Sequence, residues 1–144
     1  MKSFDALRNR IHAILAKHFG AVHTSTEGEF RVVNDSAHLF VSVDHGFGTD
    51  GLVVKLTCPL INRVPLSTDL YRWVSIEGRN FLLGGIFLIP HANGTHGELW
   101  FSHNFSADDL DEKELLGSIY PILVLCNELD NQLQNRFGGH LFSY

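Results

Sequence analysis

The sequence predicts an α+β fold: a five-stranded antiparallel sheet and three helices in the order helix, three strands, helix, two strands, helix. Two observations carry this prediction. Apolar residues recur every three or four positions in some segments, as on one face of a helix, and alternate with polar residues in others, as in strands. Short turns join consecutive strands, which makes them antiparallel and collects the helices mainly on one face of the sheet. The length of 144 residues fits one domain over residues 1–144.

The first helix is predicted over residues 3–19. Its apolar face consists of Phe4, Leu7, Ile11, Ile14 and Leu15. Ser3 can cap the start of this helix, and Gly20 can close its end. The basic residues lie off the apolar face, and we interpret them as the solvated side of a helix that packs on the sheet. A targeting or membrane-surface helix is the alternative interpretation.

Three strands follow the first helix. They are predicted over residues 29–33, 37–44 and 51–58. Residues 21–28 are expected to form a polar connection, and the third strand is expected to end at Pro59. Proline has no backbone donor, so it is poorly suited to the middle of a sheet.

Two further helices are predicted. The first covers residues 67–76 with Ser67 as its N-cap, and the second covers residues 111–137. At about 1.5 Å per residue the last helix is roughly 40 Å long, enough to cross a whole sheet. Pro121 interrupts it, and its ring crowds the carbonyl of Gly117, so we expect a kink or a split helix.

A hairpin is predicted around Asn93-Gly94, because this pair suits a type I′ turn in which both central residues have positive φ. The turn places Phe87 opposite Trp100 on neighbouring strands. One face of the hairpin is entirely apolar and consists of Ile86, Leu88, Leu99 and Phe101. The other face is mixed and consists of Phe87, Ile89, Trp100, Glu98, His91 and His96. The apolar face predicts a core, and the mixed face is the candidate functional surface.

The charge pattern argues against nucleic-acid binding. The net charge is −5 and the eleven Lys and Arg residues are scattered along the chain, whereas a nucleic-acid site needs clustered positive charge. Cys58 and Cys126 lie in apolar runs, so we expect buried free thiols. We see no signal peptide and no apolar run of membrane-spanning length, so we expect a cytoplasmic protein without membrane contact.

Three motifs suggest chemistry without establishing it. Residues 46–51 match the G-x-G-x-x-G pattern, but a strand follows instead of the helix that a phosphate site needs, so we expect a hairpin loop. His91 and His96 could share a metal with Glu98 if they face each other across the hairpin, but Glu98 is two residues along and no cysteine joins the set. The acidic run at residues 108–114 suits a solvated helix start. We therefore expect no cofactor, no native metal and no enzymatic activity.

Several short motifs resemble those of YbjN-like proteins of actinobacteria and of type III secretion chaperones. These motifs are FLLGGI at residues 81–86, ELWFSH at 98–103, NELD at 127–130 and RFGG at 136–139. The element order resembles that family over almost the whole chain. The resemblance implies a chaperone-like module that binds peptides or proteins and is often a homodimer. It assigns no binding residue by position.

The expected function is therefore to hold a peptide or protein segment. Phe87, Ile89 and Trp100 are the candidate partner-binding residues, with Trp73 of the second helix as their neighbour. The segment would dock on the mixed face or add as a strand to an exposed sheet edge. Two alternatives stay open: Phe87 and Trp100 could fill the core, or the mixed face could join two copies in a regulatory or structural homodimer without a peptide client.

Overall fold

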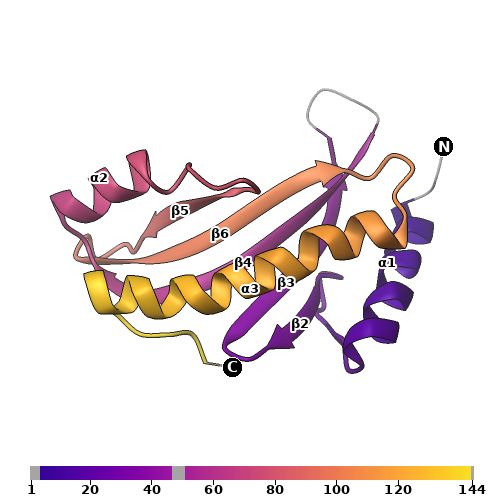
Figure 1. Cartoon of the computed structure of the whole chain (residues 1–144), viewed down its shortest axis with the longest axis horizontal. Helices are drawn as coiled ribbons and strands as arrows, with labels where there is room; N and C mark the ends of the chain where they lie inside the picture. Colours follow the sequence, from indigo (N-terminus) through magenta and orange to yellow (C-terminus); the bar gives the residue numbers. More distant parts are fainter. Residues whose placement is uncertain (1–3, 47–50, 144) are drawn as a thin grey trace.

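The computed structural model describes residues 4–46 and 51–143. Within these residues the helices are α1 (Phe4–Phe19), α2 (Thr68–Ile76) and α3 (Glu112–Phe137). The strands are β1 (His23–Thr24), β2 (Phe30–Asn34), β3 (Ala37–His45), β4 (Leu52–Pro65), β5 (Gly85–Pro90) and β6 (His96–Ser106). All neighbouring strands are antiparallel and lie in the order β1-β2-β3-β4-β6-β5 (Figure 1). The predicted α+β class and antiparallel sheet are confirmed.

The sheet has six strands in the described residues, so the prediction of five strands is wrong. The additional strand is β1, which pairs with β2 through His23 opposite Arg31. It falls inside the stretch expected to be a polar connection. A strand of two residues is too short to show the alternation by which strands are recognised in a sequence.

Strand β4 is longer than predicted. It continues through Pro59 to Pro65, and Pro59 lies opposite Trp100 of β6. The pairing with β6 shifts register between Pro59 and Ile61 and again between Ile61 and Val64. Proline has no backbone N–H to donate to a neighbouring strand. Pro59 stands where the irregular pairing begins, so its missing hydrogen bond does not break a regular ladder.

The β5–β6 hairpin has the predicted register, with Ile86 opposite Phe101 and Phe87 opposite Trp100. Its turn is not type I′, because only Gly94 of the Asn-Gly pair has a positive φ, of 72°. The Gly94 amide donates to the His91 carbonyl at 3.1 Å, and the Asn93 side chain accepts from the Thr95 amide at 3.0 Å. The Asn93 side chain thus stabilises a longer loop with the same register.

The predicted cap of α2 is present, and α3 has a cap that was not predicted. The Ser67 hydroxyl accepts a hydrogen bond from the Leu70 amide at 3.1 Å. At the start of α3, Asp111 and Glu114 form a capping box in which each side chain accepts from the backbone amide of the other. The predicted cap at Ser3 lies outside the described residues.

A kink or a split helix was expected at Pro121; α3 runs unbroken through this residue, so the split is wrong. Both Pro121 and Gly117 are exposed. The carbonyl that loses its donor therefore lies on the solvent side, where water can replace the missing hydrogen bond.

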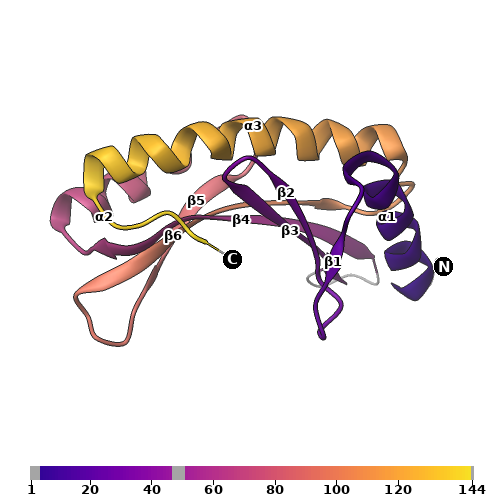
Figure 2. The same ribbon diagram turned by 90° about the horizontal axis from the view of Figure 1, so that it is seen from below.

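The core lies between the sheet and the helices. Helix α3 runs along one face of the sheet over β3 and β4, and α1 packs against β2 and β3 (Figure 2). The inward residues of the strands, such as Leu39, Leu56 and Phe101, are fully buried. Strands β3 and β4 are direct antiparallel neighbours, as the hairpin interpretation of residues 46–51 requires, although residues 47–50 lie outside the described part. None of the described helices combines the length and apolar character needed to cross a membrane.

Candidate functional site

The mixed face of the β5–β6 hairpin is open to solvent. Alternation along β5 turns Ile86 into the core and leaves Phe87 and Ile89 37% and 42% exposed on the opposite face. Trp100 lies opposite Phe87 in the ladder and is half-buried. In the described parts of the chain, no helix covers this side of the hairpin (Figure 2). Phe87 and Ile89 therefore belong to a surface and not to the core. We call Phe87, Ile89 and Trp100 the open-face cluster.

Trp100 is the centre of a group of aromatic rings. Its ring centroid lies 6.2 Å from that of Phe40 on β3 and 5.7 Å from that of Phe142. Phe142 follows α3 and meets the indole edge-on. The Trp100 indole nitrogen donates to a Glu98 carboxylate oxygen at 3.3 Å. The indole is thus held in one orientation, with an apolar body and a satisfied polar atom.

Polar side chains border the open-face cluster at the turn of the hairpin. His91 Nε2 lies 3.3 Å from Glu98 Oε2, while His96 Nδ1 pairs with the Thr95 hydroxyl at 2.8 Å. The two imidazoles therefore have different partners. Among the described residues, no group of three His, Cys, Asp or Glu side chains could hold a metal ion. The arrangement forms a polar rim beside an apolar patch, as in many binding surfaces.

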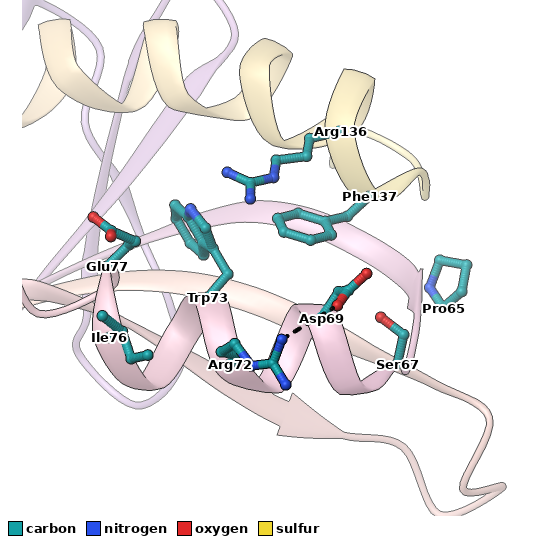
Figure 3. A pocket seen from close by; sticks show the side chains of 9 residues that line it. All are labelled: Pro65, Ser67, Asp69, Arg72, Trp73, Ile76, Glu77, Arg136 and Phe137. Atoms are coloured by element: carbon teal, nitrogen blue, oxygen red, sulfur yellow. Dashed lines mark ion pairs between the residues drawn. The ribbon is translucent and has the colours of Figure 1, made fainter.

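The structure separates Trp73 from the open-face cluster. Trp73 projects from α2 toward the end of α3, where its ring meets Phe137 edge-on with centroids 5.7 Å apart (Figure 3). Helix α3 packs on the other face of the sheet, so the expectation that Trp73 neighbours Phe87 and Trp100 is wrong. The sequence does not show on which side of the sheet the connection from β4 to β5 passes. A partner-binding role for Trp73 stays a prediction.

Trp73 instead lines an open cleft of about 610 Å³ between α2 and α3. The cleft is lined by Pro65, Ser67, Asp69, Arg72, Trp73, Ile76, Glu77, Arg136 and Phe137 (Figure 3). Arg72 pairs with Asp69 at 4.0 Å, and the Arg136 guanidinium lies 5.1 Å from the centroid of the Phe137 ring. Both charge signs are present, so the cleft shows no charge preference for a partner.

The NELD motif at residues 127–130 has a structural role that the sequence did not reveal. The Asn127 carbonyl oxygen accepts from the Ala37 amide at 2.9 Å, and the Ser36 hydroxyl donates to Asp130 Oδ2 at 2.6 Å. Both contacts fasten α3 to the turn between β2 and β3. The only signal in the sequence was the family resemblance of the motif. The hydrogen bond between Asn127 and Ala37 joins residues that lie 90 positions apart in the chain.

Both cysteines are buried and free, as predicted. The thiol of Cys126 on α3 hydrogen-bonds with that of Cys58 on β4, and this contact together with burial raises the pKa of Cys126. A raised pKa keeps the thiol protonated, and the thiolate is the nucleophilic form. Cys126 therefore lacks the properties of a catalytic cysteine.

Solved structures share this fold. The crystal structure of the Yersinia pestis type III secretion chaperone SycH, in complex with a stable fragment of YscM2, superposes with a TM-score of 0.52 and 12% sequence identity. The match covers 88% of this chain and 99% of SycH. At this identity the likeness shows the fold alone. None of the curated proteins compared with the sequence matches it.

The family is shown by a sequence model that matches residues 5–143. Its description is "T3SS (YopN, CesT) and YbjN peptide-binding chaperone 1". The match covers nearly the whole chain and agrees with the fold and with the resemblance of the short motifs. The chain belongs to this family of peptide-binding chaperones.

Proposed function

We propose that this protein binds an extended peptide or protein segment on the open-face cluster and acts as a chaperone-like module, not as an enzyme. The observation that carries the proposal is the exposure of Phe87 and Ile89 beside Trp100 on a sheet face that no described helix covers. Large exposed apolar side chains that gather in one place, bordered by polar groups, are typical of interaction sites. Membership in a peptide-binding family supports this choice.

The chemistry of the site fits an apolar segment with few charges. Phe87 and Ile89 offer apolar area, and Trp100 adds a large rigid ring with its nitrogen already satisfied by Glu98. His91 and Glu98 form a polar rim that orients a partner more than it contributes to affinity. Strand β5 is an edge strand of the sheet, so a partner could also add as a further strand.

The α2–α3 cleft is a second contact region in this proposal. Trp73 lines it, and Ile76 at its border is 50% exposed. A segment on the open-face cluster does not reach this cleft directly, because the cleft lies on the helix side of the sheet. A Trp73→Ala variant measured separately would show whether the cleft contributes to binding.

The test is the capture of a partner by a Phe87→Ala/Trp100→Ala variant from a lysate of the native organism, followed by cross-linking and mass spectrometry. Removing two central anchors should weaken binding of the dominant partner by at least about 2 kcal/mol, roughly thirtyfold. Circular dichroism and thermal unfolding check that the variant is folded.

Leu82→Ala provides a matched control, because Leu82 is a fully exposed apolar residue in the loop before β5. This control should capture the partner like the unmodified protein. If the double variant is folded and still captures the partner, the open-face cluster is not the binding site. If the double variant is unfolded, the two rings are part of the core and the proposal fails.

A homodimer without a peptide client is the second candidate, because the same exposed apolar surface and edge strand could join two copies. It predicts twice the monomer mass in light scattering, persistent on dilution and lost in the Phe87→Ala/Trp100→Ala variant. Recovery of only the protein itself from the lysate would favour this candidate.

A further inference from the structure

We infer that the segment after α3 occupies part of the open-face cluster as an internal ligand, and that its residues indicate the class of external ligand. This segment, residues 139–142, is called the tail below. The inference rests on the proposed function of the open-face cluster and specifies its ligand class. It also assigns the protein a regulatory contact, because an external peptide must displace the tail.

The first observation is a backbone bridge between the tail and β4. The Asn62 amide donates to the His140 carbonyl at 2.7 Å, and the His140 amide donates to the Asn62 carbonyl at 2.8 Å. Asn62 has no partner in the β4–β6 ladder, which shifts register between Ile61 and Val64, and the β3–β4 ladder on the other side of β4 ends at Thr57. A bulge leaves a residue unpaired, and here the tail pairs with it.

The second observation is a glycine turn that leads from α3 into the tail. Gly138 and Gly139 have φ values of 83° and 86°, in the region that favours glycine. A Cβ on Gly139 would lie 2.6 Å from a side-chain carbon of Ile61 and 2.9 Å from the Asn62 carbonyl oxygen. Only glycine therefore permits the tail to lie this close to β4. Gln134 Nε2 also donates to the Gly139 carbonyl at 3.3 Å.

The third observation is the position of Phe142. Two residues beyond the bridge at His140, its ring meets Trp100 edge-on at 5.7 Å. From the end of α3 the tail passes back toward the middle of the sheet (Figures 1 and 2). The tail thus combines strand-like pairing with an aromatic anchor on the central residue of the open-face cluster.

These observations define the ligand class. The tail pairs with the backbone of Asn62 and contacts the ring of Trp100, so this surface takes an extended segment with an aromatic residue two positions after the residue that pairs with Asn62. The tail is covalently attached and present at a high effective concentration, so it lowers the apparent affinity for any external segment.

The experiment uses the full chain and a fluorescein-labelled peptide of residues 138–143, Gly-Gly-His-Leu-Phe-Ser, measured by fluorescence anisotropy. The Gly139→Ala variant cannot seat the tail, and Phe142→Ala removes its ring. If the tail occupies this surface nine-tenths of the time, both variants should bind the peptide about tenfold more tightly than the unmodified protein. A peptide with Ala at the Phe142 position should not bind.

Ser143→Ala is the matched control, since Ser143 is exposed directly after the tail, and the peptide affinity of this variant should equal that of the unmodified protein. Thermal unfolding checks that both tail variants are folded. Equal peptide affinity in folded Gly139→Ala, folded Phe142→Ala and the unmodified protein would overturn the inference. A concentration-dependent dimer that Phe142→Ala abolishes would also overturn it, in favour of tail exchange between copies.

The peptide-binding experiment tests the internal-ligand inference, and the capture of a client tests the proposed function, so the two can fail independently. Tighter peptide binding by the tail variants supports the inference even if no client is captured from a lysate. Client capture that depends on Phe87 and Trp100, but does not increase in either tail variant, upholds the proposed function and overturns the internal-ligand inference.

Discussion

Single polar side chains attach the longest helix to the sheet. Asn127 accepts the amide hydrogen bond of Ala37, a residue that is only 1% exposed. Beside it, the buried Asp130 accepts from Ser36. A buried backbone amide that loses its acceptor cannot turn to water instead, so its desolvation is no longer compensated. These contacts set where α3 crosses the sheet.

We expect Asn127→Ala to lower the free energy of unfolding by about 1–3 kcal/mol, because the Ala37 amide loses its acceptor. Urea denaturation measures this quantity. Asn135→Ala is the matched control, since Asn135 is an exposed asparagine on the same helix and gains the same helix propensity. Equal effects of the two substitutions would show that the contact to Ala37 contributes nothing.

The residues of the open-face cluster show which part of a site a sequence reveals. The placement of Phe87 and Phe101 on opposite faces of the hairpin follows from alternation along paired strands, so it could be predicted once the register was known. The exposure of Phe87 could not, because it depends on which face of the sheet the helices cover. The contact of Trp100 with Phe142 could not, because it depends on a chain reversal after α3. The position of Trp73 could not either, because it depends on the side of the sheet on which α2 packs.

Among the secondary-structure elements, helices were predicted better than strands. Ser67 caps α2 as predicted, and a cap is a local signal that the sequence displays directly. The extension of β4 past Pro59 and the two-residue β1 depend on pairing with neighbouring strands. Pairing is a long-range property, and a proline rule derived from regular ladders fails where the ladder has a bulge.

We expect the proline inside helix α3 to lower the stability of that helix. Replacing the exposed Pro121 by alanine restores the donor for the Gly117 carbonyl and removes the crowding by the ring. We expect the free energy of unfolding to increase by about 1–3 kcal/mol, measured by urea denaturation.

Glu128→Ala, at an exposed position of the same helix, serves as the comparison and should stay within about 0.5 kcal/mol of the unmodified protein. An unchanged or lower stability of Pro121→Ala would show that α3 depends on the local geometry that proline imposes.

At the scale of the whole molecule, the sheet has one face under helices and one open face. Partial burial lowers the pKa of both His38 on β3 and His103 on β6. For His38, the positive charge of Arg31 adds to this effect. The folded protein therefore disfavours protonation of both imidazoles relative to the unfolded chain.

This pKa difference predicts lower stability in acid. As the pH falls below about 6.5, the ordinary pKa of histidine, the unfolded chain binds protons that the folded protein does not, so the free energy of unfolding decreases. Urea denaturation at pH 7.5 and pH 5.5 checks the direction. His103→Gln should reduce the difference in the free energy of unfolding between pH 7.5 and pH 5.5. His23→Gln, at an exposed position of β1, should leave this difference unchanged. An identical pH dependence in all three proteins would contradict the prediction.

The position of α3 in the chain has a consequence for biosynthesis. Helix α3 follows all six described strands in sequence, yet it covers the apolar face that β3 and β4 present. During translation the hairpins can form while this face is still uncovered, because the contact between Ala37 and Asn127 spans 90 residues. A ribosome-bound nascent chain therefore exposes its core-forming surface until α3 has been synthesised, and in that interval this chaperone-family protein is itself prone to aggregation.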